Sequence, residues 1–191
     1  MKIIEENQKS KDQLIKNKQM KVEYVNDELD GIINHLKKER GENLIENGEL
    51  VLSAGHQFDG SLSNLIKYDK EHINNYFKNN DGCRLNESEG WIEFDFVNRK
   101  INLTSYTLRT WKVGVYYPKT WRVIGSNDKK AWDVLSSQTN NSVLNQHRFI
   151  CESNNNYYRY IRYIQNDSWY KNREFCICLT CIEFFGSILS Q

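Results

Sequence analysis

Trp91-Ile92-Glu93-Phe94-Asp95-Phe96-Val97 opens the stretch that decides the fold, and Cys181-Ile182-Glu183-Phe184-Phe185-Gly186 closes it. Between them, apolar and polar residues alternate in short runs, separated by turn residues such as Ser126-Asn127-Asp128. Because successive side chains of a strand point to opposite faces, such alternation is typical of strands with one face buried. The sequence shows neither a strand–helix–strand alternation nor an internal repeat. It therefore predicts an all-β antiparallel sandwich or barrel.

The same pattern divides the chain into three parts. Residues 1–25 form a polar lead, helical or disordered; 26–49 form an amphipathic helix and linker; and 50–191 form the β-domain. The predicted strands are 50–54, 91–97, 102–110, 120–125, 131–136, 147–152, 157–165 and 175–185. The helix, from Asp27 to Glu39, has apolar residues at the spacing of one helical face, with Asn26 or Asp27 as N-cap. Its narrow apolar stripe must pack on the following domain or on a partner.

Composition excludes several classes of function. The net charge is +1 and the pI is near 7.6, which gives no field for binding nucleic acid or an anionic membrane. No apolar run approaches the roughly 20 residues of a membrane span, and acidic residues follow Met1 too soon for a signal peptide. We therefore expect a cytoplasmic protein. The five cysteines are odd in number, so a disulfide framework is not expected.

Cys176, Cys178 and Cys181 crowd one predicted strand and invite a zinc interpretation. On a strand, however, Cys176 and Cys178 share a face while Cys181 points the other way, and no turn separates them. Buried free thiols explain this spacing better, and no metal or other cofactor is predicted from it.

Four pieces in order carry a family resemblance: Val51-Leu52-Ser53-Ala54; Trp91 to Phe96; Trp121-Arg122-Val123-Ile124-Gly125-Ser126-Asn127-Asp128 closing on Trp132; and Arg159-Tyr160-Ile161-Arg162-Tyr163 leading through Trp169 to Leu179 and Gly186. Over the last three quarters of the chain, this set resembles the coagulation-factor type C, or discoidin-like, domain of the galactose-binding-like superfamily. The resemblance implies a jelly-roll sandwich that binds carbohydrates, lipid head groups or protein partners through loops at one end. It also implies that Trp169, a recurrent family tryptophan, has a structural role.

Two departures from the family pattern have consequences. The cysteine pair that ties the ends of secreted members is missing beside Val51 and Gly186, which resembles an intracellular branch. The family's Asp-Gly turn is replaced by Asp128-Lys129-Lys130, so we expect a longer loop or a type I turn in place of a tight turn with positive φ.

Loops are the candidate binding sites, because their backbone can vary without disturbing the packed strands. Three segments are the candidates. By order along the chain, 56–65 and 74–89 correspond to the family's ligand-facing loops, and 111–118 is added because it carries three aromatic residues near a turn. From them and their flanks we predict these ligand-binding residues: His56, Asp59, Asn64, Tyr68, Asn79, Trp111, Tyr116 and Tyr117. Aromatic rings on exposed loops stack on sugars or fill partner pockets, although Trp111 and Tyr116 could instead fold back to cover the sandwich end. Weak calcium candidates are Asp59, Asp69 and Asp81, which are also common turn residues.

Three functions follow from these residues. The first is a non-catalytic module that recognises a carbohydrate or protein ligand, attached to a larger assembly through the N-terminal helix. The second is an intracellular protein–protein adaptor without sugar binding. The third and least supported is a glycoside-acting enzyme using Glu93 and Asp95, which alternate on one strand face that solvation explains more simply. Cross-strand arginines are expected to brace acidic neighbours: Arg109, Arg122, Arg159 and Arg162.

Overall fold

The computed structural model describes residues 19–55, 58–59, 61–68, 78–79, 90–110, 117–143, 145–169, 177 and 179–190, with backbone alone for 58–59 and 78–79. In chain order the elements are β1 (Gln19–Val22), α2 (Ile32–Arg40), β2 (Val51–Ala54), β3 (Phe58–Asp59), the 3-10 helix η1 (Leu62–Ile66), β4 (Lys78–Asn79), β5 (Gly90–Asp95), β6 (Arg99–Thr110), β7 (Pro118–Ser126), β8 (Asp133–Gln138), β9 (Gln146–Ile150), β10 (Tyr160–Ser168) and β11 (Leu179–Ser190).

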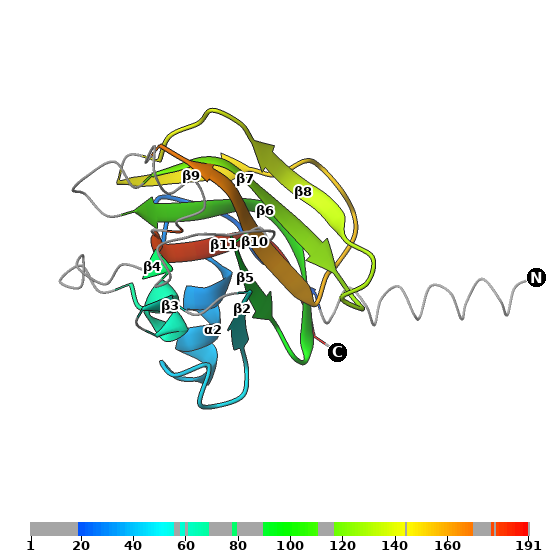
Figure 1. The fold of residues 1–191 in the computed structure, drawn as a ribbon. Helices are drawn as coiled ribbons and strands as arrows, with labels where there is room; N and C mark the ends of the chain where they lie inside the picture. Colours follow the sequence, from blue (N-terminus) through cyan, green and yellow to red (C-terminus); the bar gives the residue numbers. More distant parts are fainter. Residues whose placement is uncertain are drawn as a thin grey trace, which may run out of the picture.

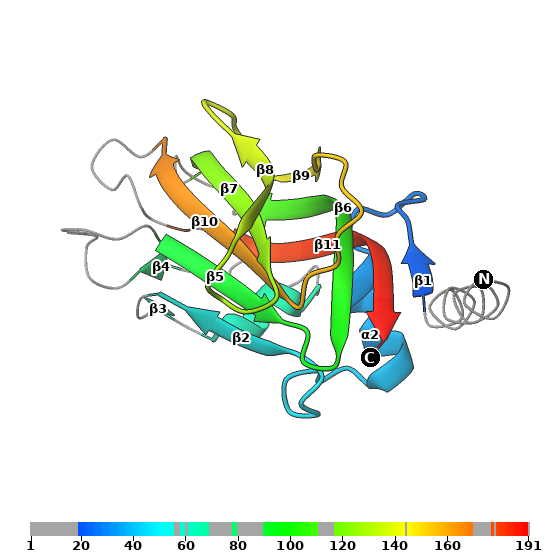
Figure 2. The same cartoon turned by 90° about the vertical axis from the view of Figure 1, so that its right-hand side faces the viewer.

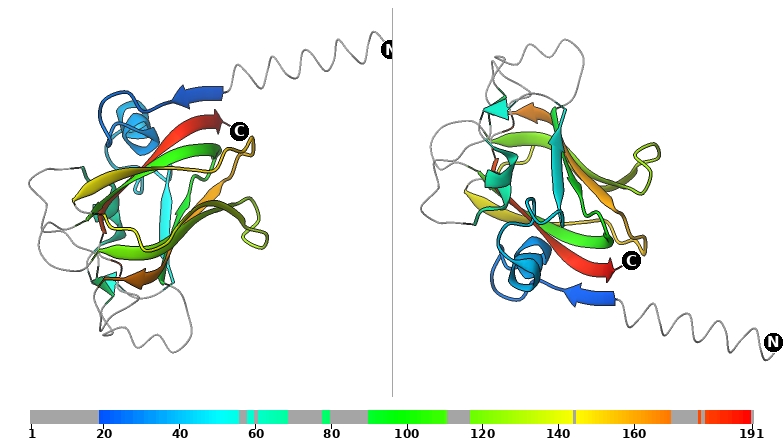
Figure 3. Two further views of the ribbon diagram at one scale, coloured as in Figure 1. Left: turned by 90° about the horizontal axis from the view of Figure 1, so that it is seen from above. Right: turned by 90° about the horizontal axis from the view of Figure 1, so that it is seen from below.

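Two antiparallel sheets form the sandwich (Figure 1). The first, called sheet A, has the strand order β1-β11-β6-β9, and the second, sheet B, has the order β2-β5-β10-β7-β8. A small ribbon of β3 and β4 stands beside them. Figure 3 shows the two layers with α2 on the outside of β11. The all-β sandwich predicted from the alternating pattern is confirmed.

The space between the sheets is filled by the inward-facing residues of the alternating strands. Phe94 of sheet B meets Phe184 of sheet A edge to face, with ring centroids 4.9 Å apart. Near them, the indole nitrogen of the buried Trp121 donates to the Tyr106 hydroxyl at 2.9 Å, and that hydroxyl lies 3.1 Å from Ser136 Oγ. The core therefore pairs the polar tips of its large aromatic residues, as burial requires.

Helix α2 belongs to the sandwich, because its apolar face is fully covered. Ile32, Ile33 and Leu36 are buried in the common core cluster. The helix starts so close to β11 that a Cβ at Gly31 would lie 2.2 Å from the Phe184 carbonyl oxygen. Only glycine fits this approach. Of the two possibilities left open by the sequence, packing on the following domain is the one observed.

A carboxylate from the opposite part of the chain caps this helix. Glu183 of β11 is buried, and its oxygens accept the backbone N–H groups of Ile33 at 2.9 Å, Asn34 at 3.0 Å and Phe184 at 2.7 Å. These donors and the positive end of the helix dipole favour the ionised carboxylate. Burial acts in the opposite direction and dominates, raising the pKa of Glu183 to about 7.

The N-terminal region differs from the expectation in two ways. Residues Gln19–Val22, placed in the polar lead, form β1 and pair with β11. The helix begins at Ile32 and not near Asp27, whose side chain instead accepts the Leu29 N–H at 2.9 Å in a preceding turn. The N-cap residue Gly31 has no side chain to accept a hydrogen bond from the first turn of α2. Glu183 of β11 accepts it instead. Among the described residues, no helix is both long and apolar enough to cross a membrane.

The turn after β7 corrects another expectation. Lys129 has a φ of 61°, so the positive φ that Asp-Gly provides in the family is kept here by a lysine. Side chains on both sides hold this backbone: Ser126 Oγ accepts the N–H of Lys129 at 3.0 Å, and Asp128 Oδ1 accepts those of Lys130 at 2.8 Å and Ala131 at 2.9 Å. These local hydrogen bonds stabilise a left-handed backbone conformation that lysine rarely adopts.

Candidate binding site at the loop end of the sandwich

Several strands begin or end at one common end of the sandwich. Leu179, the first residue of β11, pairs with Thr110, the last residue of β6. Ser168 at the end of β10 pairs with Pro118 at the start of β7, and β5 begins with Gly90 beside the end of β10. In Figure 2 the ends of β5, β7 and β10 lie on the left. Gly90, which follows the predicted segment 74–89, and Thr110, which precedes the predicted segment 111–118, therefore lie at this end. We call this the loop end.

The structure describes the side chains of only some predicted ligand-binding residues, namely Asn64, Tyr68 and Tyr117. Asp59 and Asn79 lie in β3 and β4, where the backbone alone is described. His56, Trp111 and Tyr116, and the calcium candidates Asp69 and Asp81, lie outside the described residues. The calcium prediction and most of the predicted loop contacts therefore stay predictions.

The three described residues do not share one surface. Asn64 and Tyr68 lie in and after η1, which packs on β11 and β2, and both line a pocket shared with α2. Tyr117 precedes β7, and its carbonyl oxygen accepts the backbone N–H of Trp169 at 3.1 Å. The predicted site thus separates into an η1 side and a Trp169 side.

Trp169 is an exposed aromatic residue at the loop end. It follows β10 directly, and its side chain is 44% exposed. Its indole N–H donates to the Asn141 carbonyl oxygen at 2.7 Å, which fixes the orientation of the ring. With its backbone held by Tyr117, the residue is positioned from two directions while much of its surface faces solvent.

Charged and amide groups surround this ring. The Lys119 ammonium lies 5.3 Å from the ring centroid and 2.6 Å from Asp167 Oδ2. Asn141, whose side-chain amide donates to Gln138 at 2.9 Å, adds a polar neighbour. We call the set of Tyr117, Lys119, Asn141, Asp167 and Trp169 the Trp169 cluster. A fixed aromatic ring beside a carboxylate, an ammonium and an amide can stack on an apolar ligand face and exchange hydrogen bonds with hydroxyl groups.

Comparisons with known proteins support the fold. No family model matches the chain, and no curated protein matches it. Among solved structures, it is similar to a family 32 carbohydrate-binding module of a family 31 glycoside hydrolase from Clostridium perfringens (TM-score 0.59, 11% identity, 73% of this chain and 92% of that one). It is also similar to the family 32 module of NanJ from C. perfringens in complex with galactose (0.55, 9%, 74% and 94%). The same module type of AlyQ, in complex with 4,5-unsaturated mannuronic acid, matches at 0.53, with 16% identity over 71% and 93%.

The chain has the discoidin-like fold. These matches cover over nine tenths of each of the three modules, so the sandwich of this chain corresponds to nearly the whole of each module. The resemblance predicted from the ordered sequence pieces is thereby confirmed for the fold. Sequence reasoning gave Trp169 a structural role, and its two backbone contacts agree with one. The exposure of its ring was missed, although the polar run Asn166-Asp167-Ser168 before it signals a strand end.

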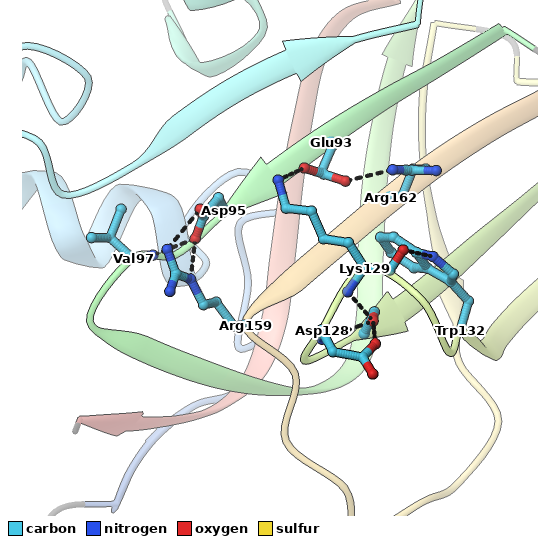
Figure 4. Close-up of polar contacts among 9 residues, drawn as sticks. Glu93, Asp95, Val97, Asp128, Lys129, Trp132, Arg159 and Arg162 are labelled. Carbon is cyan, nitrogen blue, oxygen red and sulfur yellow. Dashed lines mark hydrogen bonds and ion pairs between the residues drawn. The ribbon is translucent and has the colours of Figure 1, made fainter.

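The two carboxylates considered for glycoside chemistry are already paired on the outer face of sheet B (Figure 4). Glu93 is only 2% exposed, and its oxygens lie 2.7 Å from Lys129 Nζ and 2.7 Å from Arg162 Nη2. Asp95 receives two hydrogen bonds from Arg159, at 2.6 and 2.9 Å. The interpretation of a solvated strand face is wrong for Glu93, because the turn after β7 folds back over it.

Tryptophans complete this network. The Arg162 guanidinium carbon lies 4.1 Å from the Trp91 ring and 4.2 Å from the Trp132 ring, so the cation is stacked between two indoles. The Trp132 indole N–H donates to the Lys129 carbonyl oxygen at 3.2 Å. The predicted bracing by arginine is confirmed for Arg159 and Arg162, whereas Arg109 donates instead to Thr180 at 3.3 Å.

The thiols agree with the structural interpretation where they are described. Cys151 and Cys181 are free and buried. Burial raises the pKa of Cys151 to about 12 and that of Cys181 well above its ordinary value, so both side chains are protonated thiols at neutral pH. Within the described part of the chain, no three His, Cys, Asp or Glu side chains gather as a metal site. Cys83, Cys176 and Cys178 lie outside it.

Proposed function

We propose that the chain is a non-catalytic carbohydrate-binding module whose ligand binds at the loop end, on the Trp169 cluster. The observation that carries the proposal is the exposed Trp169 ring, held by Asn141 and Tyr117 beside the Lys119–Asp167 pair. The complexes of similar modules with galactose and with an unsaturated mannuronic acid support it, since they show that this fold accommodates sugars.

Preorganisation is the physical reason to favour this cluster. A ring that is already fixed loses little conformational freedom when a sugar stacks on it. The Lys119 ammonium lies 5.3 Å from the ring centroid with the Asp167 carboxylate beside it, so both groups can add directional hydrogen bonds, which supply specificity for hydroxyl positions. The protein thus offers both an apolar face and polar groups, as a pyranose ring requires.

The other functions left open by the sequence lack such support. A glycosidase pair needs carboxyl groups that are free to transfer protons or attack, whereas Glu93 and Asp95 are held by Lys129, Arg162 and Arg159. Attachment through the helix has no exposed apolar stripe to use, because that stripe is buried on the chain's own sandwich. A cytosolic location stays a prediction.

The test is a glycan array followed by calorimetric titration with galactose and with each sugar the array selects. We expect Trp169→Ala to abolish saturable binding, and Trp111→Ala tests the prediction made from the sequence alone. Trp132→Ala is the matched control, because it removes an indole from the far end of β7 and should lower stability without touching the loop end. A silent array together with a specific protein partner recovered in a pull-down would contradict the proposal.

A further inference from the structure

A pocket lies between α2, the turn that follows it, and η1, and none of its lining residues belongs to the Trp169 cluster. Its volume is about 940 Å³, and its wall includes Lys37, Glu42, Asn43, Leu62, Asn64 and Tyr68. The size matches that of pockets for small organic ligands. The lining combines amide and hydroxyl groups with aliphatic side chains, so both polar and apolar parts of a ligand would find neighbours.

Lys37 is the unusual residue of this wall. Its side chain is only 6% exposed, although it carries a positive charge. Its ammonium donates to the Ile66 carbonyl oxygen and lies 4.3 Å above the Tyr68 ring. The carboxylate facing it, Glu42, stands 4.0 Å away on a side chain that is 88% exposed, which makes a weak ion pair.

This arrangement leaves the buried charge under-compensated. An ammonium has three N–H donors, and within the described residues Lys37 uses one of them in a hydrogen bond to a neutral acceptor. A buried cation with so few partners is costly, and burial accordingly lowers the pKa of Lys37. The hydrogen bond to the Ile66 carbonyl oxygen braces α2 against η1, but it uses only one of the three ammonium donors and could be made by a neutral donor.

The charges around the pocket restrict the ligand. Lys67 adds a second positive charge, and Glu42 and Glu46 add two negative ones. A dianion such as phosphate would be repelled by the two carboxylates, whereas a single carboxylate can meet the Lys37 ammonium and form the strong charge-assisted hydrogen bond that Glu42 does not. Leu62 and the Tyr68 ring lie in position to cover an apolar ligand body.

We propose that this pocket binds a small organic monocarboxylate, anchored by Lys37, independently of sugar binding at the loop end. The carboxylate occupies the place beside the ammonium, Asn64 contacts the polar part of the ligand, and the aliphatic wall of η1 covers the remainder.

The proposal is tested by calorimetry and by amide chemical shifts with matched acids and neutral partners: hexanoate against hexanamide, glucuronate against glucose, and inorganic phosphate. We expect at least one acid to bind and its neutral partner to fail. Lys37→Met should weaken the acid by about tenfold to a hundredfold, the loss expected for one charge-assisted hydrogen bond. Lys38→Met, on the exposed neighbour, is the control.

Asn64→Trp offers a second variant that fills the pocket without removing the Lys37–Ile66 contact, in case Lys37→Met does not fold. Trp169→Ala should bind the acid normally, and Lys37→Met should bind neutral sugars normally, so failure here is separable from failure of the sugar proposal. The inference is overturned if no acid binds, if amides or phosphate bind as well as the acids, or if Asn64→Trp keeps full affinity.

Discussion

Trp169 and Trp132 make similar contacts but differ in how much of each ring is available to a ligand. Each indole N–H donates to a backbone carbonyl oxygen, and each ring lies near a cation, Lys119 or Arg162. At Trp132, however, the cation is itself stacked on Trp91 and paired with the buried Glu93. At Trp169 the ring remains 44% exposed. The contacts of Trp132 cover part of the outer face of sheet B, whereas those of Trp169 leave an aromatic surface exposed to solvent.

An aromatic residue beside a charged side chain can therefore serve stability in one place and binding in another. Where the cation is stacked between two rings and paired with a buried carboxylate, the contacts stabilise the sandwich. Where the cation and its carboxylate partner remain at the surface beside a fixed ring, the same groups are available to a ligand. Variants at both ends and at the capped helix can therefore separate stability from binding.

Glu183→Ala should cause the largest loss of stability among these variants, because the Glu183 carboxylate has a structural role. It leaves the N–H groups of Ile33, Asn34 and Phe184 without their acceptor in a buried place. We expect a loss of about 4 kcal/mol in the free energy of unfolding, since each orphaned buried donor costs about 1–3 kcal/mol and relief of the buried charge offsets part. Urea unfolding measures this. A loss below that of Trp132→Ala would contradict the role of Glu183 as the cap of α2.

The next largest effect is pH-dependent and comes from the same group. Burial raises the pKa of Glu183 from its ordinary value of 4.5 to about 7, so the folded chain holds this proton more tightly than the unfolded chain. Its contribution to stability is thus greatest at low pH and is lost as the pH rises from 4.5 to 7, by at most about 3 kcal/mol. The difference in unfolding free energy between wild type and Glu183→Gln should shrink over this range; a constant difference would show that Glu183 does not titrate there.

Trp132→Ala should lower the free energy of unfolding by about 2 kcal/mol, because it exposes one face of Arg162 and removes a partly desolvated cation–π contact. Thermal and urea unfolding measure the change. Sugar titration of this variant should match the wild type. Loss of sugar binding in Trp132→Ala would erase the distinction between the two ends.

Trp169→Ala should show the reverse behaviour. Because its ring is exposed and keeps one side-chain hydrogen bond, stability should fall by only about 1 kcal/mol. Sugar binding, in contrast, should be lost. If the variant unfolds as readily as Trp132→Ala and still binds sugar, Trp169 is a structural residue only.

Asp167→Asn should have the smallest effect on stability, below about 1 kcal/mol, because its pair with Lys119 is partly exposed to water and salt. The affinity for sugar should fall severalfold through loss of a charged acceptor, as measured by calorimetry. An unchanged affinity would exclude Asp167 from the contact surface.

The sequence predicted the sandwich because one physical rule, alternation between a buried and an exposed face, operates along every long strand. Phe94 and Phe184 illustrate it, since both face the core as their positions require. The rule says nothing of partners across the chain. It could not show that Glu183 caps a helix 150 residues earlier, because that contact depends on how α2 docks.

The site was harder to predict for the same reason. Tyr117 and Lys119 lie at the start of β7, Trp169 follows β10 and Asn141 follows β8. They meet through the pairing of β7 with β10 and a backbone contact between Asn141 and Lys119. Asn64 and Tyr68, selected as loop residues, instead line the pocket beside α2, an element outside the strand pattern. Side-chain exposure, which separates Trp169 from Trp132, depends on the folded arrangement.

The most direct test of sugar binding at the loop end follows the indole N–H signals of Trp169 and Trp132 by nuclear magnetic resonance, during titration with galactose and with each array-selected sugar. We predict a saturable shift of the Trp169 signal while the Trp132 signal stays in place. Saturable binding that moves Trp132 and leaves Trp169 unmoved, or the absence of saturable binding by any of these sugars, would contradict this prediction.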